Sequence, residues 1–136
     1  MLDSDNQPIA DGILSSDQIK MAIANNVIKM QSPPLDGQIQ PASLDLRLSS
    51  RAWRIQTSFL PGANATVSDK LANLALHEID LTDGAVLEKG CVYLVELQES
   101  LALPSHLSAI ANPKSSTGRV DVFTRLITDG AIEFET

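Results

Sequence analysis

The chain has 136 residues, of which 43% are hydrophobic, and its formal net charge at pH 7 is −7. A chain of this size can form one domain with a core of its own. Its negative charge disfavours binding to nucleic acid, and no run of about 18 apolar residues predicts a membrane span. Residues 1–11 are acidic and polar and carry no signal-type segment, so we expect a cytoplasmic protein.

The sequence has few side chains for a Cys/His zinc site: one cysteine, Cys91, and two histidines, His77 and His106. A single cysteine cannot form an internal disulfide, and these three side chains are too few for a Cys/His zinc site. Because free cysteine is usually buried, we interpret Cys91 as a structural core residue. We predict no zinc and no other metal bound by protein ligands alone.

The first regular element is predicted after residue 14. Ser15 and Gln18 have the spacing of a capping box, which indicates the start of a short helix, and Asn25 and Asn26 indicate its end. We expect an extended piece over residues 27–30 after this helix. The prolines and glycine that follow predict a connecting loop.

From residue 42 the apolar pattern changes to a period of two, which predicts a half-buried strand over 42–48. Asp45 and Arg47 would share the polar face of this strand. There they could fix a strand or subunit contact, or they could touch a ligand. A second strand is predicted over 52–56, with Trp53 and Ile55 on one face and Arg54 and Gln56 on the other.

The middle of the chain predicts one more short helix, over 68–76, from its leucines and helix-forming neighbours. Alternation over 77–81 and a β-rich run over 91–97 predict two further strands, separated by turns at Gly84 and Gly90. Many short strands, few helices and closely spaced turns indicate a mostly β domain, either a barrel or a sandwich.

The segment 111–119 combines two cations, three consecutive hydroxyls and a glycine, after an apolar run over 107–111 that we interpret as a strand. Lys114 supplies a mobile charge and Arg119 a rigid fork of donors, while residues 115–117 supply hydroxyls and backbone N–H groups. Such donors are typical of an anion-binding loop, and a triphosphate is its natural ligand. A second possible cationic cluster consists of Arg47, Arg51 and Arg54.

Three blocks, in this order, resemble motifs of the dCTP deaminases in the trimeric dUTPase superfamily. The block Pro41-Ala42-Ser43-Leu44-Asp45-Leu46-Arg47-Leu48 is similar to the Pro-Ala-Ser-x-Asp-x-Arg-Leu block of that family. Residues 94–104 resemble the strand that leads there to a Leu-Pro turn. Lys114-Ser115-Ser116-Thr117-Gly118-Arg119 resembles the motif Arg/Lys-Ser-Ser-x-x-Arg.

The resemblance, over about residues 12–130, implies a dUTPase-like distorted barrel of the β-clip type with one or two short helices, assembled as a homotrimer. It implies hydrolytic deamination of dCTP to dUTP and ammonia without zinc, with Mg²⁺ bound through the nucleotide triphosphate. By position in the motif, the implied catalytic residues are Ser115 and Arg119. The implied phosphate- and substrate-binding residues are Lys114, Ser116, Ile127 and Thr128.

One departure concerns the general base, which in the family is a glutamate in a glycine-flanked context beyond the Ser-Ser motif. Only 17 residues follow Arg119 here, and Glu133 and Glu135 come too early and lack those glycines. We therefore expect residues 1–136 to form a single dUTPase-like domain that is incomplete at its C-terminal end. It would be the N-terminal part of a longer bacterial two-domain deaminase, and inactive alone.

Three classes of function remain open from the sequence. The first is a deaminase, with or without dUTP diphosphatase activity. The second is a non-catalytic nucleotide-binding or regulatory module on the same fold. The third is a structural trimerisation domain.

Overall fold

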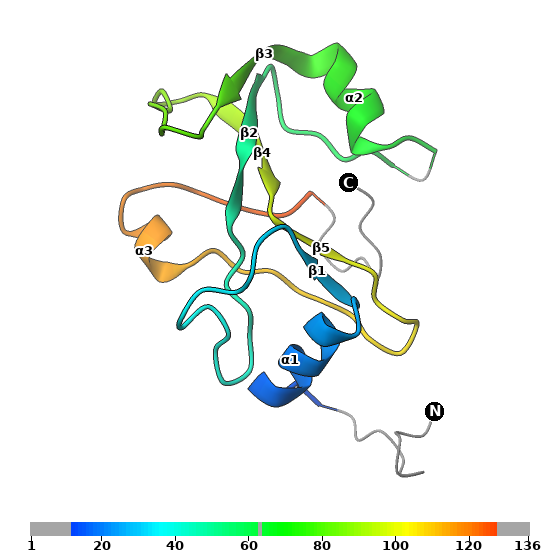
Figure 1. Ribbon diagram of the computed structural model, residues 1–136. Coiled ribbons are helices and arrows are strands. Elements are labelled where there is room, and N and C mark those ends of the chain that lie inside the picture. The colour runs from blue at the N-terminus through cyan, green and yellow to red at the C-terminus, as the bar shows by residue number, and fades with distance from the viewer. Residues whose placement is uncertain (1–11, 63, 128–136) are drawn as a thin grey trace.

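The computed structural model describes residues 12–62 and 64–127, which form short strands and helices joined by turns and long loops (Figure 1). The described part holds three helices, which are α1 (Ser16–Ala24), α2 (Val67–Leu74) and α3 (Ser115–Gly118). It holds five strands, which are β1 (Ile28–Met30), β2 (Leu48–Ile55), β3 (Ala75–Asp80), β4 (Val92–Leu97) and β5 (Glu99–Leu101). The prediction of a mostly β domain is confirmed. The helices exceed the expected one or two by α3, which is a single turn of four residues.

Within these residues the strands form two separate antiparallel sheets. In the larger sheet β2 lies between β3 and β4, and in the smaller one β1 pairs with β5. Figure 1 shows the larger sheet in the upper half of the view, with the smaller sheet and α1 below it. No closed barrel is formed by the strands of residues 12–62 and 64–127.

The helix α1 begins where its capping residues predict. The Ser15 hydroxyl accepts the N–H of Gln18 at 3.4 Å, and the Gln18 side chain accepts the N–H of Ser15 at 2.8 Å. Asn26 follows the helix in the left-handed conformation, with φ 57°, and turns the chain toward β1. The carbonyl of Pro41 accepts the N–H of Ser16 at 2.9 Å, which joins the helix start to a distant part of the chain.

The two strands predicted over 42–48 and 52–56 are instead one strand, β2, that begins at Leu48. Before it, Leu44 makes only an isolated bridge with Ile39. Residues 42–47 therefore have the alternating apolar pattern of a strand, but they lie outside the two sheets.

Side chains explain why the strand starts late. The backbone C=O of Asp45 accepts Nε2 of Gln38 at 2.8 Å, and the N–H of Asp45 donates to the carbonyl of Gln38 at 3.0 Å. The N–H of Arg47 donates to the carboxylate of Glu99 at 2.7 Å. These backbone groups are already hydrogen-bonded, so they are not available to a sheet ladder.

The elements of the middle segment follow the prediction. The predicted second helix is α2, and Thr66 and Asp69 form a capping box at its start. The strand predicted over 77–81 is β3, which begins two residues earlier, at Ala75, and ends at Asp80. Gly84 and Gly90 both have φ near 80°, at 81° and 77°, which is the left-handed conformation that the predicted turns require.

The buried core of the described residues is small. Its apolar members, each 8% exposed or less, are Ile19, Ile28, Ala52, Ile55 and Leu103. Cys91, predicted to be a core residue, is only half-buried, because it lies at the exposed turn before β4 with its thiol 3.8 Å from the carboxylate of Glu88. Several large apolar side chains of the described residues lie exposed, among them Ile110 at 81% and Phe123 at 86%.

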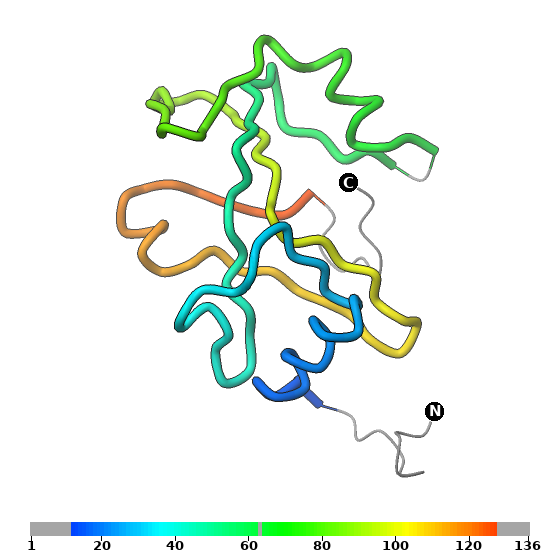
Figure 2. Tube along the Cα trace, in the orientation of Figure 1, coloured from blue at the N-terminus to red at the C-terminus, as the bar shows by residue number. Residues whose placement is uncertain are grey.

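The apolar run 107–111 does not form the predicted strand. Figure 2 shows the chain leaving β5 through a turn and crossing the domain in a long irregular segment before α3. Within the described residues, no backbone hydrogen bond joins 108–113 to a strand, and Ile110 is 81% exposed. A strand needs a partner for its N–H and C=O groups, and this segment has none in the described part of the chain.

No helix within 12–62 and 64–127 has the length and apolar character needed to span a bilayer.

Candidate phosphate-binding site

The predicted anion-binding loop, residues 114–119, folds around the one-turn helix α3 (Figure 1). The carbonyl of Lys114 accepts the N–H of Thr117 at 3.0 Å, which closes the turn. Ser115 and Ser116 are exposed, and among the described residues nothing accepts a hydrogen bond from their backbone N–H groups. The loop therefore presents hydroxyls and N–H groups of the kind that bind phosphate oxygens.

The ammonium of Lys114 forms an ion pair with the carboxylate of Asp45. The Lys114 side chain is 63% exposed and that of Asp45 is 31% exposed, so the pair lies at the surface with one face open to solvent. This contact joins the two motifs of the sequence, which are 69 residues apart. The sequence singled out both residues but did not predict that they meet.

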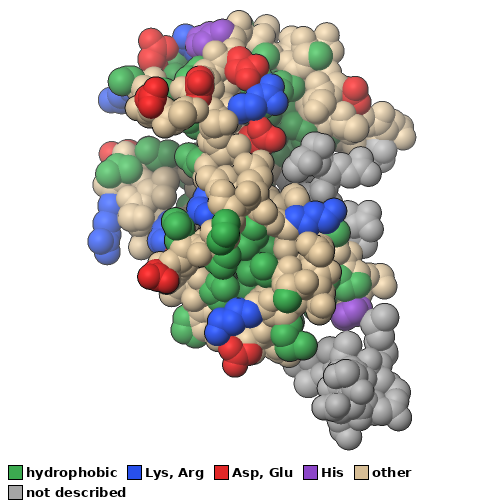
Figure 3. Space-filling view, viewed as in Figure 1, with side chains coloured by type: hydrophobic (Ala, Val, Ile, Leu, Met, Phe, Trp, Pro, Cys, Tyr) green, Lys and Arg blue, Asp and Glu red, His purple; other side chains and the backbone are tan. Residues whose placement is uncertain are grey.

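The second cation of the loop, Arg119, is exposed and makes no ion pair within residues 12–62 and 64–127. Two apolar side chains that follow it in the chain are also exposed, Val120 at 68% and Phe123 at 86%. In the space-filling view the lobe that carries α3 shows apolar and cationic side chains together on its surface (Figure 3). The guanidinium of Arg119 is thus accessible to an anion from solvent.

The interpretation of Arg47, Arg51 and Arg54 as a second cationic cluster is wrong, because each one is paired with a glutamate. The N···O distances are 2.7 Å for Arg47 and Glu99, 2.8 Å for Arg51 and Glu78, and 3.0 Å for Arg54 and Glu88. Arg51 also lies 4.7 Å from the centre of the Trp53 ring, and its hydrogen bond lowers the pKa of Glu78. These pairs balance all three guanidinium charges, whereas the loop 114–119 keeps the charge of Arg119 outside any ion pair of the described residues.

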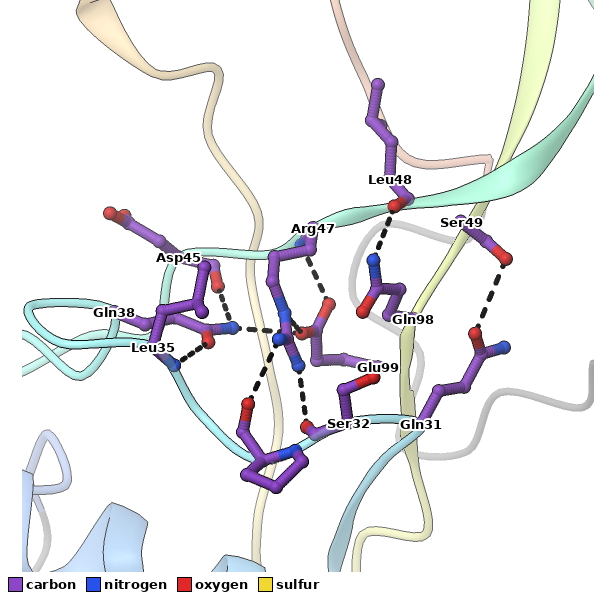
Figure 4. Close-up of polar contacts among 11 residues, drawn as sticks. Gln31, Ser32, Leu35, Gln38, Asp45, Arg47, Leu48, Ser49, Gln98 and Glu99 are labelled. Atoms are coloured by element: carbon purple, nitrogen blue, oxygen red, sulfur yellow. Dashed lines mark hydrogen bonds and ion pairs between the residues drawn. The ribbon is translucent and has the colours of Figure 1, made fainter. Parts of the chain in front are cut away.

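A buried polar network holds the segment that carries Asp45 (Figure 4). At its centre is Glu99, whose side chain is 1% exposed. Its carboxylate accepts the backbone N–H of Arg47 at 2.7 Å, Nε of Arg47 at 2.7 Å and Nε2 of Gln38 at 2.9 Å. Gln38 is itself 5% exposed and also binds the backbone of Asp45 on both sides.

The guanidinium of Arg47 also holds the loop that precedes this segment. It donates to the carbonyl of Pro33 at 3.1 Å and to that of Ser32 at 2.8 Å. No buried side-chain nitrogen or oxygen of the described residues is left without a partner. Of the two roles considered for Arg47, the structural one is confirmed. Arg47 connects strand and loop, as the neighbouring contacts in Figure 4 also show.

The remaining candidate residues lie at or beyond the end of the described region. Ile127 is half-buried and is the last described residue, and Thr128, Glu133 and Glu135 lie outside it. Their proposed parts in binding or proton transfer stay predictions. Among the described residues, no three Asp, Glu, His or Cys side chains gather in a way that could hold a metal ion.

Sequence reasoning missed Gln38 and Glu99, the two residues on which the position of Asp45 depends. Glu99 is 52 residues from Arg47, so no local spacing indicates that they pair. The available signal is chemical. Arg47 lies in an apolar alternating segment, and an arginine buried there needs a carboxylate partner from elsewhere in the chain.

These features define a class of small β domain in which two motifs distant in sequence meet, and in which one of them presents cations and hydroxyls to solvent. The sequence model of the family described as "2'-deoxycytidine 5'-triphosphate deaminase (DCD) N-terminal domain" matches residues 10–136. The chain therefore belongs to the family of dCTP deaminase N-terminal domains, and the resemblance seen in the motifs is confirmed.

Curated and solved relatives agree with this family. The chain is 31% identical over 90 residues to a dCTP deaminase of Halorubrum lacusprofundi, covering 65% of this chain and 44% of that protein. It is 29% identical over 112 residues to a "dCTP deaminase, dUMP-forming" of Beutenbergia cavernae, covering 82% of this chain and 57% of that protein.

A solved structure gives the stronger likeness. The crystal structure of 2'-deoxycytidine 5'-triphosphate deaminase from Agrobacterium tumefaciens superposes with a TM-score of 0.83 at 56% sequence identity. The match covers 91% of this chain and 38% of that chain. The chain spans less than two thirds of the length of each of these three relatives.

Proposed function

We propose that this chain is the N-terminal part of a longer dCTP deaminase, which converts dCTP and water to dUTP and ammonia. The observation that carries the proposal is the exposed loop 114–119. Its cations and hydroxyls face solvent in a chain whose net charge is −7. In so acidic a chain an anionic nucleotide needs a local cationic site. Membership of the deaminase family supplies the reaction class.

Within this loop the roles divide between binding and chemistry. Lys114 and Ser116 hold phosphate oxygens, the lysine as a point charge and the serine through its hydroxyl and N–H. Ser115 and Arg119 lie at the reacting centre, where water adds to C4 of the cytosine and ammonia leaves. Charged and hydroxyl donors there stabilise the tetrahedral intermediate. Ile127 and Thr128 contact the nucleotide at the start of the base-recognition hairpin.

The general base is a glutamate C-terminal to residue 136, so the 136-residue chain is inactive alone. Magnesium arrives with the triphosphate and screens its charge. The donor set of the loop suits this arrangement, because it offers cations, hydroxyls and N–H groups to phosphate oxygens and no free carboxylate to a metal. The carboxylate that contacts the loop, that of Asp45, is already paired with Lys114.

The fold of the whole protein is a dUTPase-like distorted barrel of the β-clip type, which later residues complete, and the assembly is a homotrimer in the cytoplasm. Two observations support an incomplete barrel. The apolar run 107–111 lacks a partner strand in the described residues, and large apolar side chains such as Ile110 and Phe123 are more than 80% exposed.

A second candidate reaction is supported by one relative. The Beutenbergia cavernae protein is named a dUMP-forming dCTP deaminase. An enzyme of that kind uses two waters and releases ammonia and diphosphate, leaving dUMP. Chromatography of the products formed from dCTP separates the two: dUTP supports the simple deaminase, and dUMP with diphosphate supports the second candidate.

Kinetics of two loop variants in the complete protein test the proposal. Charge-assisted hydrogen bonds contribute about 1.5–3 kcal/mol, so Lys114→Ala should weaken dCTP binding about tenfold or more. Loss of Arg119 should instead lower the turnover number, by about 10²–10³-fold, more than it weakens binding. Ammonia release and direct titration with dCTP measure the two effects.

The matched control is Lys89→Ala, which removes an exposed lysine at the turn before β4. It should change neither quantity. Unchanged affinity and turnover in both loop variants would remove the support for the site. Binding of dCTP by the complete wild-type protein without ammonia release would favour the non-catalytic module.

A further inference from the structure

Among the residues that the structure describes, one polar contact fastens the loop 114–119 to the rest of the domain. Within residues 12–62 and 64–127, every other hydrogen bond made by the segment 108–127 is local to that segment, such as those of the N–H groups of Thr117 and Val122. Among the same described residues, the ion pair of Lys114 with Asp45 is the single hydrogen bond or salt bridge that leaves the segment. The position of the loop therefore depends on Asp45.

Asp45 is a firm anchor because its backbone is held on both sides. Its N–H donates to the carbonyl of Gln38 at 3.0 Å, and its C=O accepts Nε2 of Gln38 at 2.8 Å. The same Nε2 donates to the carboxylate of Glu99, which is buried beneath Arg47 (Figure 4). The carboxylate of Asp45 thus projects from a fixed backbone, while Lys114 reaches it from a segment with no other such tie to the described residues outside it.

We propose that Asp45 is a positioning residue, which docks the phosphate-binding loop onto the domain through Lys114. The inference rests on the proposed function, in that the loop binds the triphosphate. Asp45 fixes the position of the Lys114 ammonium before the nucleotide binds. It thereby also fixes where Ser115 and Arg119 of the same loop lie. The ion pair has one face open to solvent, so the ammonium can hold a phosphate oxygen while it stays bonded to the carboxylate.

Hydrogen exchange in the absence of nucleotide tests the docking itself. The exchange rates to be measured are those of the amides of Thr117, Gly118, Arg119 and Val120, whose N–H groups are hydrogen-bonded within the loop. In Asp45→Asn, expressed in the complete protein, these amides should exchange about two- to fivefold faster, as expected for loss of an exposed ion pair. In the control Asp36→Asn, which removes an equal charge from an exposed loop residue, they should not change.

Steady-state kinetics with dCTP test whether docking serves binding. Asp45→Asn should raise KM about two- to fivefold, and Asp45→Glu, which keeps the carboxylate, should restore most of the loss. In the Lys114→Ala background the Asp45 substitution should have no further effect, because the residue acts through Lys114.

Two results would overturn the proposal. One is an unchanged exchange rate in Asp45→Asn. The other is a lower KM in that variant, which would mean that Asp45 only repels the triphosphate. The exchange measurement needs no substrate, so its outcome does not depend on the deaminase assignment. A wild-type protein that binds no dCTP would sink the proposed function and leave the exchange result standing.

Discussion

Replacing Glu99 by glutamine should destabilise the domain more than any change at an exposed ion pair. The substitution keeps the shape of the side chain but turns one acceptor oxygen into an NH₂ donor. Because Glu99 is 1% exposed, no water can replace a lost hydrogen bond. Depending on which oxygen is replaced, the donor left without an acceptor is the backbone N–H of Arg47, or it is Nε of Arg47 together with Nε2 of Gln38. It also leaves the guanidinium of Arg47, which is 15% exposed, without a counter-charge.

Breaking a buried ion pair from one side costs about 3–5 kcal/mol. Because glutamine keeps part of the hydrogen bonding, we expect a loss of about 3 kcal/mol for Glu99→Gln. This is a large fraction of the roughly 5–15 kcal/mol that stabilises a typical protein. With a urea m-value of about 1–3 kcal/mol/M, the midpoint of unfolding should fall by about 1–3 M.

Equilibrium unfolding in urea, followed by the fluorescence of Trp53 on β2, is the assay. The matched control is Glu78→Gln, because the Arg51–Glu78 pair has the same chemistry and a similar distance of 2.8 Å, but its side chains are 53% and 51% exposed. The control should lower the midpoint of unfolding far less, because solvent screens an exposed pair. Equal losses for the two variants would refute the argument that burial makes the Glu99 network the stronger one.

Two further predictions concern assembly and pH. Sedimentation of the 136-residue chain should show a self-associated species, because large apolar side chains such as Ile110 and Phe123 are exposed in it; a stable monomer at high concentration would count against both this apolar surface and the homotrimer. The pKa values of Asp69 and Glu78 are lowered, mainly by the N-cap hydrogen bond from Thr66 and by the hydrogen bond from Arg51. The stability that these two carboxylates contribute is fully present above their pKa values in the unfolded chain, near 4. It is lost as the pH falls through their lowered pKa values in the folded chain. Acid titration of stability should therefore show a smaller loss for Glu78→Gln than for wild type.

Features set by neighbouring residues could be predicted from the sequence. The capping box at Ser15 needs only a hydroxyl and a side-chain acceptor three residues later, and it was predicted. The box at Thr66 has the same spacing, but the second helix was predicted from its leucines without it. The turns at Gly84 and Gly90 depend on the ability of glycine to adopt positive φ. These choices are made within a few residues, so a single sequence contains the information.

Features that depend on distant partners could not be predicted. The alternation over 42–48 is that of a strand, but Gln38 and Glu99 take the backbone groups that a strand would use. The run 107–111 is apolar enough for a strand, yet its partner does not lie among the described residues. In both cases the local pattern was read correctly, and the pairing that decides the outcome is non-local.

The site was predicted in part for the same reason. Chemical types in one short segment indicate an anion-binding loop, and family motifs give the expected roles of Ser115 and Arg119. That Lys114 is bonded to Asp45 cannot be read from either motif alone. The arginine cluster failed because counting cations ignores the glutamates that fold against them, as Arg47 and Glu99 show.

The buried ion pair of Arg47 and Glu99 is better explained by the backbone segments that it holds in place than by its contribution to stability. Apolar side chains of similar size could fill the space of Arg47 and Glu99 at little or no loss of free energy, but they could not bind backbone groups. Glu99 holds the N–H of Arg47, and the guanidinium holds the carbonyls of Ser32 and Pro33. Together they keep the segment before β2 out of the sheet and bring Asp45 to the surface opposite Lys114. A more apolar core would free those backbone groups to extend β2, and the loop that we assign to phosphate would lose its anchor.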